Sequence, residues 1–264
     1  MRIYVSVDME GIAGVALREQ LQRGQSAYEE ARYLLTQEVN AVVDALASFG
    51  VKDIVVKDAH GGGYNFIADS LHPAAVYVMG STPLDKRFPG LERGFDGAFL
   101  MGYHAMASTF GAVRDHTMSS AQYRGVKLNG QPIGEIGLDS LLFGLNGVPV
   151  IMVSGDDKAC QEAEELLPGV TIYATKTGLS RHAALMKAPQ RVRSELRGAV
   201  QKALARVGQA APFCIASPYE VVIQFNSSDW ADARSYDGVD SERLDAVTAR
   251  YRSDDLVKVL TRAI

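Results

Sequence analysis

The feature that most constrains the fold is a strand–helix–strand pattern at the start of the chain. Residues 2–8 (RIYVSVD) are β-branched and aromatic and end in a carboxylate, which predicts a buried strand. Residues 26–49 repeat apolar side chains at helical spacing, and residues 51–58 (VKDIVVKD) predict a second strand. Because a helical crossover joins parallel neighbours, this βαβ unit predicts a parallel sheet.

The same pattern continues to about residue 176. Further strands are expected at residues 75–79, 96–102, 148–154 and 169–174, with a hairpin at 123–133 that turns at Asn129-Gly130 and helices from 134 to 145 and after residue 155. We therefore expect an α/β catalytic domain over residues 1–175, built on a mostly parallel sheet flanked by helices.

The character of the sequence then changes. An Arg-rich amphipathic helix is expected at 191–206, strands at 218–225 and 246–252, and a last helix capped by Ser253-Asp254. These later strands suit antiparallel pairing, so we expect a smaller α+β lobe over residues 176–264. At the first long helix, Ser26 and Glu29 fit a capping box, and Gly50 fits a C-terminal stop.

Composition excludes several classes of partner. The 264 residues carry 27 basic and 31 acidic side chains, so the net charge of -4 argues against nucleic-acid binding. No segment reaches the ~18 apolar residues of a membrane span, and the N-terminus lacks the pattern of a signal peptide. Cys160 and Cys214 lack metal-binding spacing, and we expect buried free thiols in a reduced, cytoplasmic protein.

Potential metal ligands follow the predicted strands. Asp8 and Glu10 end the first strand, His60 follows the second, His104 follows the strand at 96–102, and Glu135 opens a helix. Ligands bind beyond the carboxyl ends of parallel strands, so these side chains should gather at one edge of the sheet. Imidazole with carboxylate suits one or two ions of zinc, manganese or iron, and the set contains no thiolate.

Each candidate also has a plainer interpretation. Asp8 and Glu10 leave a strand two residues apart and can point the same way, where a cation would relieve their repulsion; alternatively they form a solvated, helix-capping loop. His60 precedes three glycines, which suit close backbone approach to a ligand, although the run lacks the Lys-Ser/Thr of a phosphate-binding loop. His116 is a candidate base or nucleophile, or an ordinary loop residue. His72 and His182 are expected to be structural.

Together these motifs resemble a known family. The matching segments are SVDMEGIAG at 6–14, DAHGG at 58–62, GYHAMAST at 102–109, DHTMS at 115–119, GEIGLDS at 134–140, VPVIMVSGDD at 148–157 and EAEELLPGV at 162–170. In this order they resemble the zinc-dependent D-aminopeptidases of dipeptide-transport operons. The resemblance covers the first two-thirds of the chain closely and the remainder loosely, and the loop between His104 and His116 is one residue longer here.

The resemblance implies two zinc ions per subunit. Asp8 would bridge them, Glu10 and His60 would complete one site, His104 and Glu135 would complete the other, and His116 would take the place of the catalytic histidine. It also implies hydrolysis of short peptides or amides with a free N-terminus and a D residue, in a homodecamer of two pentameric rings.

Two other classes of function remain open at this stage. A dinuclear phosphohydrolase also uses Asp, Glu and His clusters, although the segments around the ligands contain few basic residues apart from Arg114. A non-catalytic module that binds metal or nucleotide is also compatible with the fold, because fold does not determine function. Metal content and turnover on amides and phosphoesters would separate the three.

Overall fold

The computed structural model describes residues 1–264 and contains two sheets. Sheet A has the strand order β3-β2-β1-β4-β7-β8-β9, and all its neighbours run parallel except β8 and β9. Its strands are β1 (Arg2–Val7), β2 (Asp53–Asp58), β3 (Val76–Val78), β4 (Gly97–Tyr103), β7 (Val150–Asp156), β8 (Thr171–Ser180) and β9 (Ala183–Met186). The predicted mostly parallel α/β sheet is confirmed.

Sheet B is smaller and antiparallel, with the order β11-β12-β10-β5-β6. Its strands are β5 (Tyr123–Leu128), β6 (Gln131–Pro132), β10 (Tyr219–Phe225), β11 (Ser241–Arg243) and β12 (Thr248–Ser253). The later strands do pair antiparallel, as expected, but they pair with the hairpin β5–β6 from the first half of the chain. Residue 176, where we expected the division into two segments, lies inside β8.

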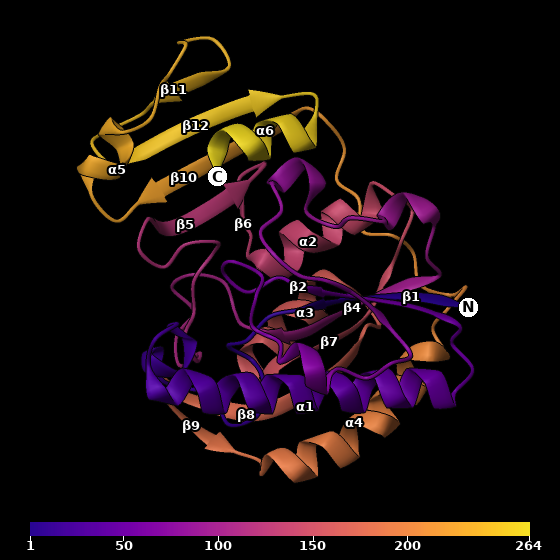
Figure 1. Ribbon diagram of the computed structural model, residues 1–264. Helices are drawn as coiled ribbons and strands as arrows, with labels where there is room; N and C mark the ends of the chain where they lie inside the picture. Colours follow the sequence, from indigo (N-terminus) through magenta and orange to yellow (C-terminus); the bar gives the residue numbers. More distant parts are fainter.

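Helices cover both faces of sheet A (Figure 1). The helices of the chain are α1 (Ser26–Ser48), α2 (Glu135–Gly144), α3 (Asp157–Leu166), α4 (Pro189–Leu204), α5 (Ser228–Asp232) and α6 (Leu256–Ala263), with short 3-10 turns η1 (Arg18–Leu21), η2 (Ala68–Ser70), η3 (Leu84–Lys86) and η4 (Leu91–Arg93). Of these, α5 and α6 pack against sheet B. No helix is both long and apolar enough to cross a bilayer.

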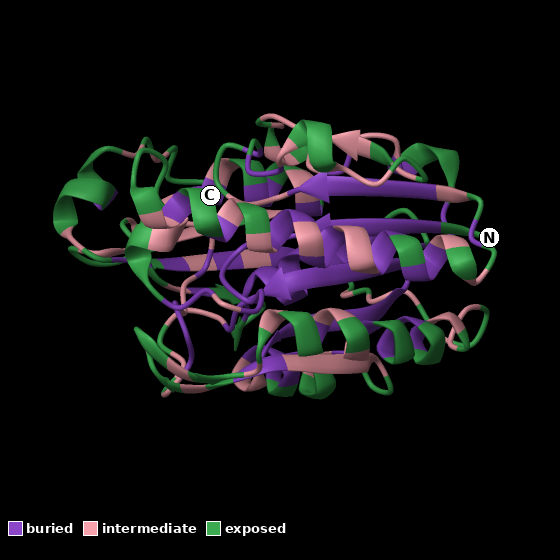
Figure 2. Ribbon diagram, turned by 60° about the horizontal axis from the view of Figure 1, so that its bottom comes forward, coloured by how far each residue is buried: buried purple, intermediate pink, exposed green.

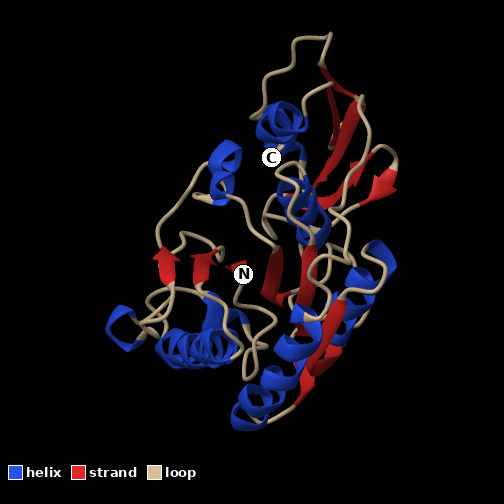
Figure 3. Ribbon diagram, turned by 90° about the vertical axis from the view of Figure 1, so that its right-hand side faces the viewer, coloured by secondary structure: helices blue, strands red, loops and turns tan.

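Two apolar cores hold these layers together. One packs α1 and α4 against sheet A, and the other joins its opposite face to α2, α3, α6 and sheet B. Figure 2 shows the strands of sheet A buried and the outer surfaces of the helices exposed. Figure 3 shows sheet B lying beyond one end of sheet A. The second core therefore spans both sheets, which explains why residues from both halves of the chain build one body.

The helix ends correct two predictions. Helix α1 begins at Ser26 itself, with Gln25 in the extended N-cap position, so the expected capping box of Ser26 and Glu29 is wrong; Glu29 pairs with Arg32 instead. The last helix is capped by the side chain of Asp255 and not by Ser253-Asp254.

The predicted stop at Gly50 is confirmed. Gly50 has a φ of +84°, its amide donates to Ala47, and the amide of Val51 donates to Leu46, which is the Schellman arrangement. Of the two cysteines, Cys160 is buried as expected, but Cys214 is exposed.

Candidate metal centre and active site

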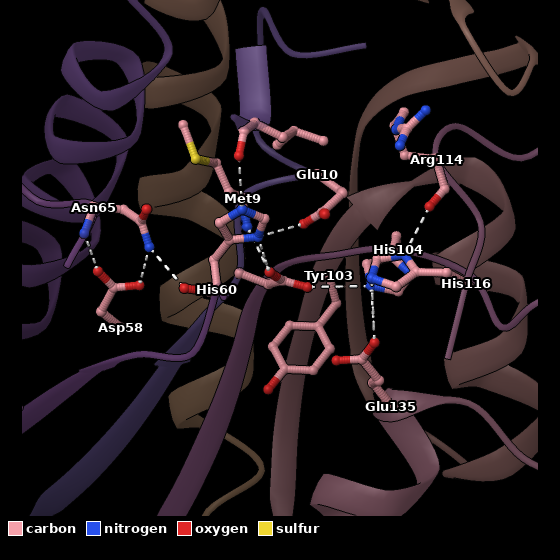
Figure 4. A network of polar contacts seen from close by, with 12 residues as sticks. Met9, Glu10, Asp58, His60, Asn65, Tyr103, His104, Arg114, His116 and Glu135 are labelled. Carbon is pink, nitrogen blue, oxygen red and sulfur yellow. Dashed lines mark hydrogen bonds and ion pairs between the residues drawn. The ribbon is translucent and has the colours of Figure 1, made fainter. Parts of the chain in front are cut away.

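Four predicted ligands come from four separate elements and meet at one edge of sheet A. Figure 4 labels three of them, His60, His104 and Glu135. Asp8 follows β1, His60 follows β2, His104 follows β4, and Glu135 is the first residue of α2. The carboxyl ends of β1, β2 and β4 are neighbours in the sheet, so the parallel topology itself brings these side chains together.

Asp8 lies between two histidines. Its Oδ1 is 3.1 Å from Nδ1 of His60, and its Oδ2 is 3.3 Å from Nε2 of His104. Glu10 Oε2 is 3.0 Å from the same nitrogen of His60, and Glu135 Oε1 is 3.3 Å from the same nitrogen of His104. The five side chains therefore form two carboxylate–imidazole groups that share Asp8.

The donor set fits metal ions. Nδ1 of His104 lies 3.0 Å from the carbonyl oxygen of Ala105, which can only accept, so this nitrogen carries the proton. The opposite nitrogen, Nε2, is buried without a hydrogen-bond partner although two carboxylates lie nearby. A cation among these atoms would satisfy it, and backbone orientation of the other ring nitrogen is typical of metal-binding histidines.

His116 lies against this cluster. Its Nδ1 donates to the carbonyl of Arg114 at 2.9 Å, so Nε2 is free to face Glu135 Oε1 at 3.6 Å. His104, His116 and Glu135 together form one group with atoms close enough to hold an ion, and Asp8, Glu10 and His104 form another. His116 therefore lies close enough to His104 and Glu135 to bind an ion with them. The sequence predicted for it a catalytic role and no role as a metal ligand.

Charge is concentrated strongly here. Burial opposes the charged forms of Asp8, His60, His104 and Glu135, but their mutual contacts outweigh it. Close contact with His104 and His60 holds the pKa of Asp8 well below its usual range, and the charge of His104 lowers the pKa of Glu135 to about 2. The nearby carboxylates raise the pKa of both His60 and His104 well above the usual value. The raised pKa values favour protonation of these two imidazoles in the absence of a cation, so metal binding would release protons.

Gly102, two residues before His104, allows β4 to approach the loop that follows β1 closely. Gly102 has a φ of +71°, and a Cβ there would lie 2.3 Å from the backbone oxygen of Asp8. The amide of Gly11 in turn donates to the carbonyl of Gly102 at 2.8 Å. Only glycine fits this position, because any side chain would push Asp8 away from His104.

Sequence reasoning missed Arg87, which supports Glu135. Its largely buried guanidinium forms a bidentate pair with Asp139, at 2.5 and 3.0 Å, and lies 3.8 Å from Glu135. Asp139 is one turn beyond Glu135 on α2 and also accepts a hydrogen bond from Tyr103 at 2.6 Å. The spacing of Glu135 and Asp139 is visible in the sequence, but nothing local marks their arginine partner.

Lys176 is a second residue that sequence reasoning missed. Its buried ammonium donates to the backbone carbonyls of Glu10, Ile12 and Val15, at 2.5, 2.8 and 2.5 Å. It thereby holds the loop that carries Glu10, from a strand more than 160 residues later in the chain.

The cluster opens into a pocket of about 350 Å³, which is lined by Asp8, Glu10, His60, His116 and Glu135 among others. This volume lies near the lower end of the roughly 300–1,000 Å³ that is usual for small-molecule sites. The site therefore suits a small substrate that contacts both the carboxylates and His116.

Comparison with known proteins agrees with this geometry. The model of the D-aminopeptidase family, Peptidase M55, matches residues 1–263. A D-aminopeptidase of Bacillus subtilis (strain 168) is 35% identical over 235 residues, which cover 88% of this chain and 85% of that protein. Among solved structures, the Zn-dependent D-aminopeptidase DppA from Bacillus subtilis, a self-compartmentalizing protease, superposes with a TM-score of 0.90 at 32% identity, covering 98% of this chain and 94% of that one.

Fold, site and comparisons together define this chain as a metallo-aminopeptidase. It belongs to the D-aminopeptidase family. Membership removes the non-catalytic module from the candidate functions.

Proposed function

We propose that this protein is a dinuclear zinc aminopeptidase that removes a D residue from the free N-terminus of short peptides or amino-acid amides. The single observation that carries the dinuclear proposal is the position of Asp8, whose two oxygens face different histidines. A bridging carboxylate of this kind is usual between two ions about 3.5–4 Å apart. The zinc-dependent relative supports the choice of metal.

In this proposal Asp8, Glu10 and His60 would hold one ion, and Asp8, His104 and Glu135 would hold the other. Two zinc ions would polarise the scissile carbonyl and activate the attacking water. His116 supplies proton transfer. Because its Nδ1 proton is committed to the carbonyl of Arg114, its Nε2 carries the lone pair that can take a proton from the nucleophile and return it to the leaving amine. Direct nucleophilic attack by the same nitrogen is the alternative role.

The experiment that tests this function measures metal content and turnover on the same preparation. Protein purified without chelator should contain close to two zinc equivalents. It should cleave D-alanyl peptides faster than their L counterparts, and it should lose activity when the metal is removed. A fully active metal-free preparation contradicts the metal proposal, and exclusive cleavage of L substrates contradicts the stereochemical part alone. Phosphoesters should not be hydrolysed.

We also propose that the chain assembles into a homodecamer of two pentameric rings. The self-compartmentalizing relative supports assembly, and so does a group of exposed apolar side chains on and beside the β8–β9 hairpin. This group consists of Phe110, Leu179, Leu185 and Met186, and Phe110 is 96% exposed. Light scattering should give about ten times the chain mass of 28.5 kDa. A monomer at working concentration would contradict the assembly.

The free thiols of Cys160 and Cys214 support a further part of the proposal, a cytoplasmic location.

A further inference from the structure

The side chain of Arg114 is buried without a charged partner. Only 8% of the residue is exposed, its Nε has no hydrogen-bond partner, and its one side-chain hydrogen bond joins Nη1 to Nδ1 of His182 at 3.4 Å. The neighbouring Asp115 is paired with Arg181 instead. A buried charge without a partner lowers the stability of a fold. The protein nevertheless keeps at this place a guanidinium that forms no ion pair with another side chain.

The backbone holds Arg114 in an unusual conformation. Its φ is +56°, which residues other than glycine seldom adopt, and its amide donates to the carbonyl of Arg181 at 3.1 Å. Its own carbonyl accepts the hydrogen bond from His116. A strained residue that also orients the candidate catalytic histidine is typical of a functional position.

Arg114 lines the same pocket as the metal cluster, together with Arg18 and Arg87. Arg87 is neutralised by Asp139, whereas Arg18 is exposed and forms no side-chain hydrogen bond or ion pair. Figure 4 shows Arg114 close to His116, across the imidazole rings from Glu135 in that view. Burial, Arg181 and Arg18 lower the pKa of Arg114, and the charges of Glu10 and Asp115 offset this only in part.

We propose that Arg114, assisted by Arg18, binds the C-terminal carboxylate of the substrate and makes the enzyme selective for very short peptides that end inside the pocket. The proposal rests on the proposed peptidase function, whose substrates carry such a group. The planar, two-pronged guanidinium matches a carboxylate, and a carboxamide in the same place would leave the charge unpaired. A pocket of about 350 Å³ suits a peptide of this size.

The test compares D-alanyl-D-alanine with its C-terminal amide, D-alanyl-D-alaninamide, on the zinc-loaded enzyme. The natural chain should prefer the free acid, and Arg114→Gln should reduce this preference by about 10- to 100-fold, mainly through KM for the acid. Arg114→Lys should restore part of it, and Arg18→Gln should have a smaller effect because that side chain is exposed. Lys202→Gln, which removes an exposed cation without an ion pair on helix α4, should leave the preference unchanged.

A binding measurement separates this inference from catalysis. Calorimetry with an analogue of the same dipeptide, in which a methylene amine replaces the scissile amide, should show that Arg114→Gln weakens binding of the acid form and hardly alters that of the carboxamide form. Equal affinity of the natural chain for both forms overturns the role of Arg114, and so does an unchanged preference in Arg114→Gln with full zinc content. Failure to cleave either peptide, with selective binding retained, would contradict the proposed function alone.

Discussion

The imidazole rings of His104 and His116 lie stacked, with centroids 3.9 Å apart and planes 14° apart. Both rings donate from Nδ1 to a backbone carbonyl, and both turn Nε2 towards Glu135. They differ in access, because the side chain of His104 is 1% exposed and that of His116 is 16% exposed. The buried ring suits a permanent ligand and the accessible ring suits contact with substrate, which supports the division of roles that we propose.

This division predicts different outcomes for two alanine variants. His116→Ala should keep both zinc ions and the fold but lose about 10²–10⁴-fold in kcat, because proton transfer is lost. His104→Ala should lose the ion that it shares with Glu135. Zinc analysis and steady-state kinetics on both variants check this. Loss of zinc from His116→Ala would instead make His116 a ligand, and near-normal kcat with full zinc would remove it from the mechanism.

Asp8 and Glu10 should differ in how many ions they hold. Asp8→Asn should release both ions. Each carboxylate oxygen of Asp8 faces a different histidine, and the amide nitrogen that replaces one of these oxygens cannot bind a metal ion. Glu10→Gln should weaken only the ion near His60, since its contact lies on that side alone. Zinc equivalents after dialysis measure the difference, and equal loss in the two variants would argue against bridging by Asp8.

Lys176→Met should disturb the first loop although it removes no proposed ligand. Three backbone carbonyls would lose their donor in a buried place, and we expect a loss of at least about 2 kcal/mol in the free energy of unfolding. The zinc ion near Glu10 should also bind less tightly than the other. Denaturant unfolding and zinc titration check both effects. Unchanged stability would show that the loop holds its shape without the lysine.

Glu162 should make stability depend on pH. Burial raises its pKa to about 7, despite a hydrogen bond from the amide of Met106 at 2.7 Å. Because the folded pKa lies above the ordinary value of 4.5, the stabilisation from this group is complete below pH 4.5 and is lost as the pH rises through about 7. As the pH rises between these limits, the free energy of unfolding of Glu162→Gln should therefore increase by up to about 3 kcal/mol relative to that of the natural chain. This figure follows from a pKa difference of about 2.5 at 1.36 kcal/mol per pKa unit. Unfolding at pH 5 and pH 8 at matched zinc content measures it, and a constant difference would contradict it.

The sequence by itself determined the layers of the fold and the edge at which chemistry-bearing residues gather. Apolar runs and helical spacing are local signals, and a parallel sheet places the residues after β1, β2 and β4 side by side. For this reason the sequence alone predicts that Asp8, His60 and His104 lie close together. Helix caps were harder to predict from the sequence. The observed N-cap residues are Gln25 and Asp255, each one residue away from the predicted Ser26 and Asp254.

Only the tertiary structure decided which distant groups support and extend the site. Lys176 meets Glu10 across 166 residues, Arg87 meets Asp139 across 52, and His182 meets Arg114 across 68. Such contacts leave no period or spacing in the sequence, because they arise where separate loops converge after the sheet has formed. Burial also cannot be read from the sequence. Arg114 would be an ordinary surface charge in an open loop, but in the folded protein it is a buried cation without an ion pair.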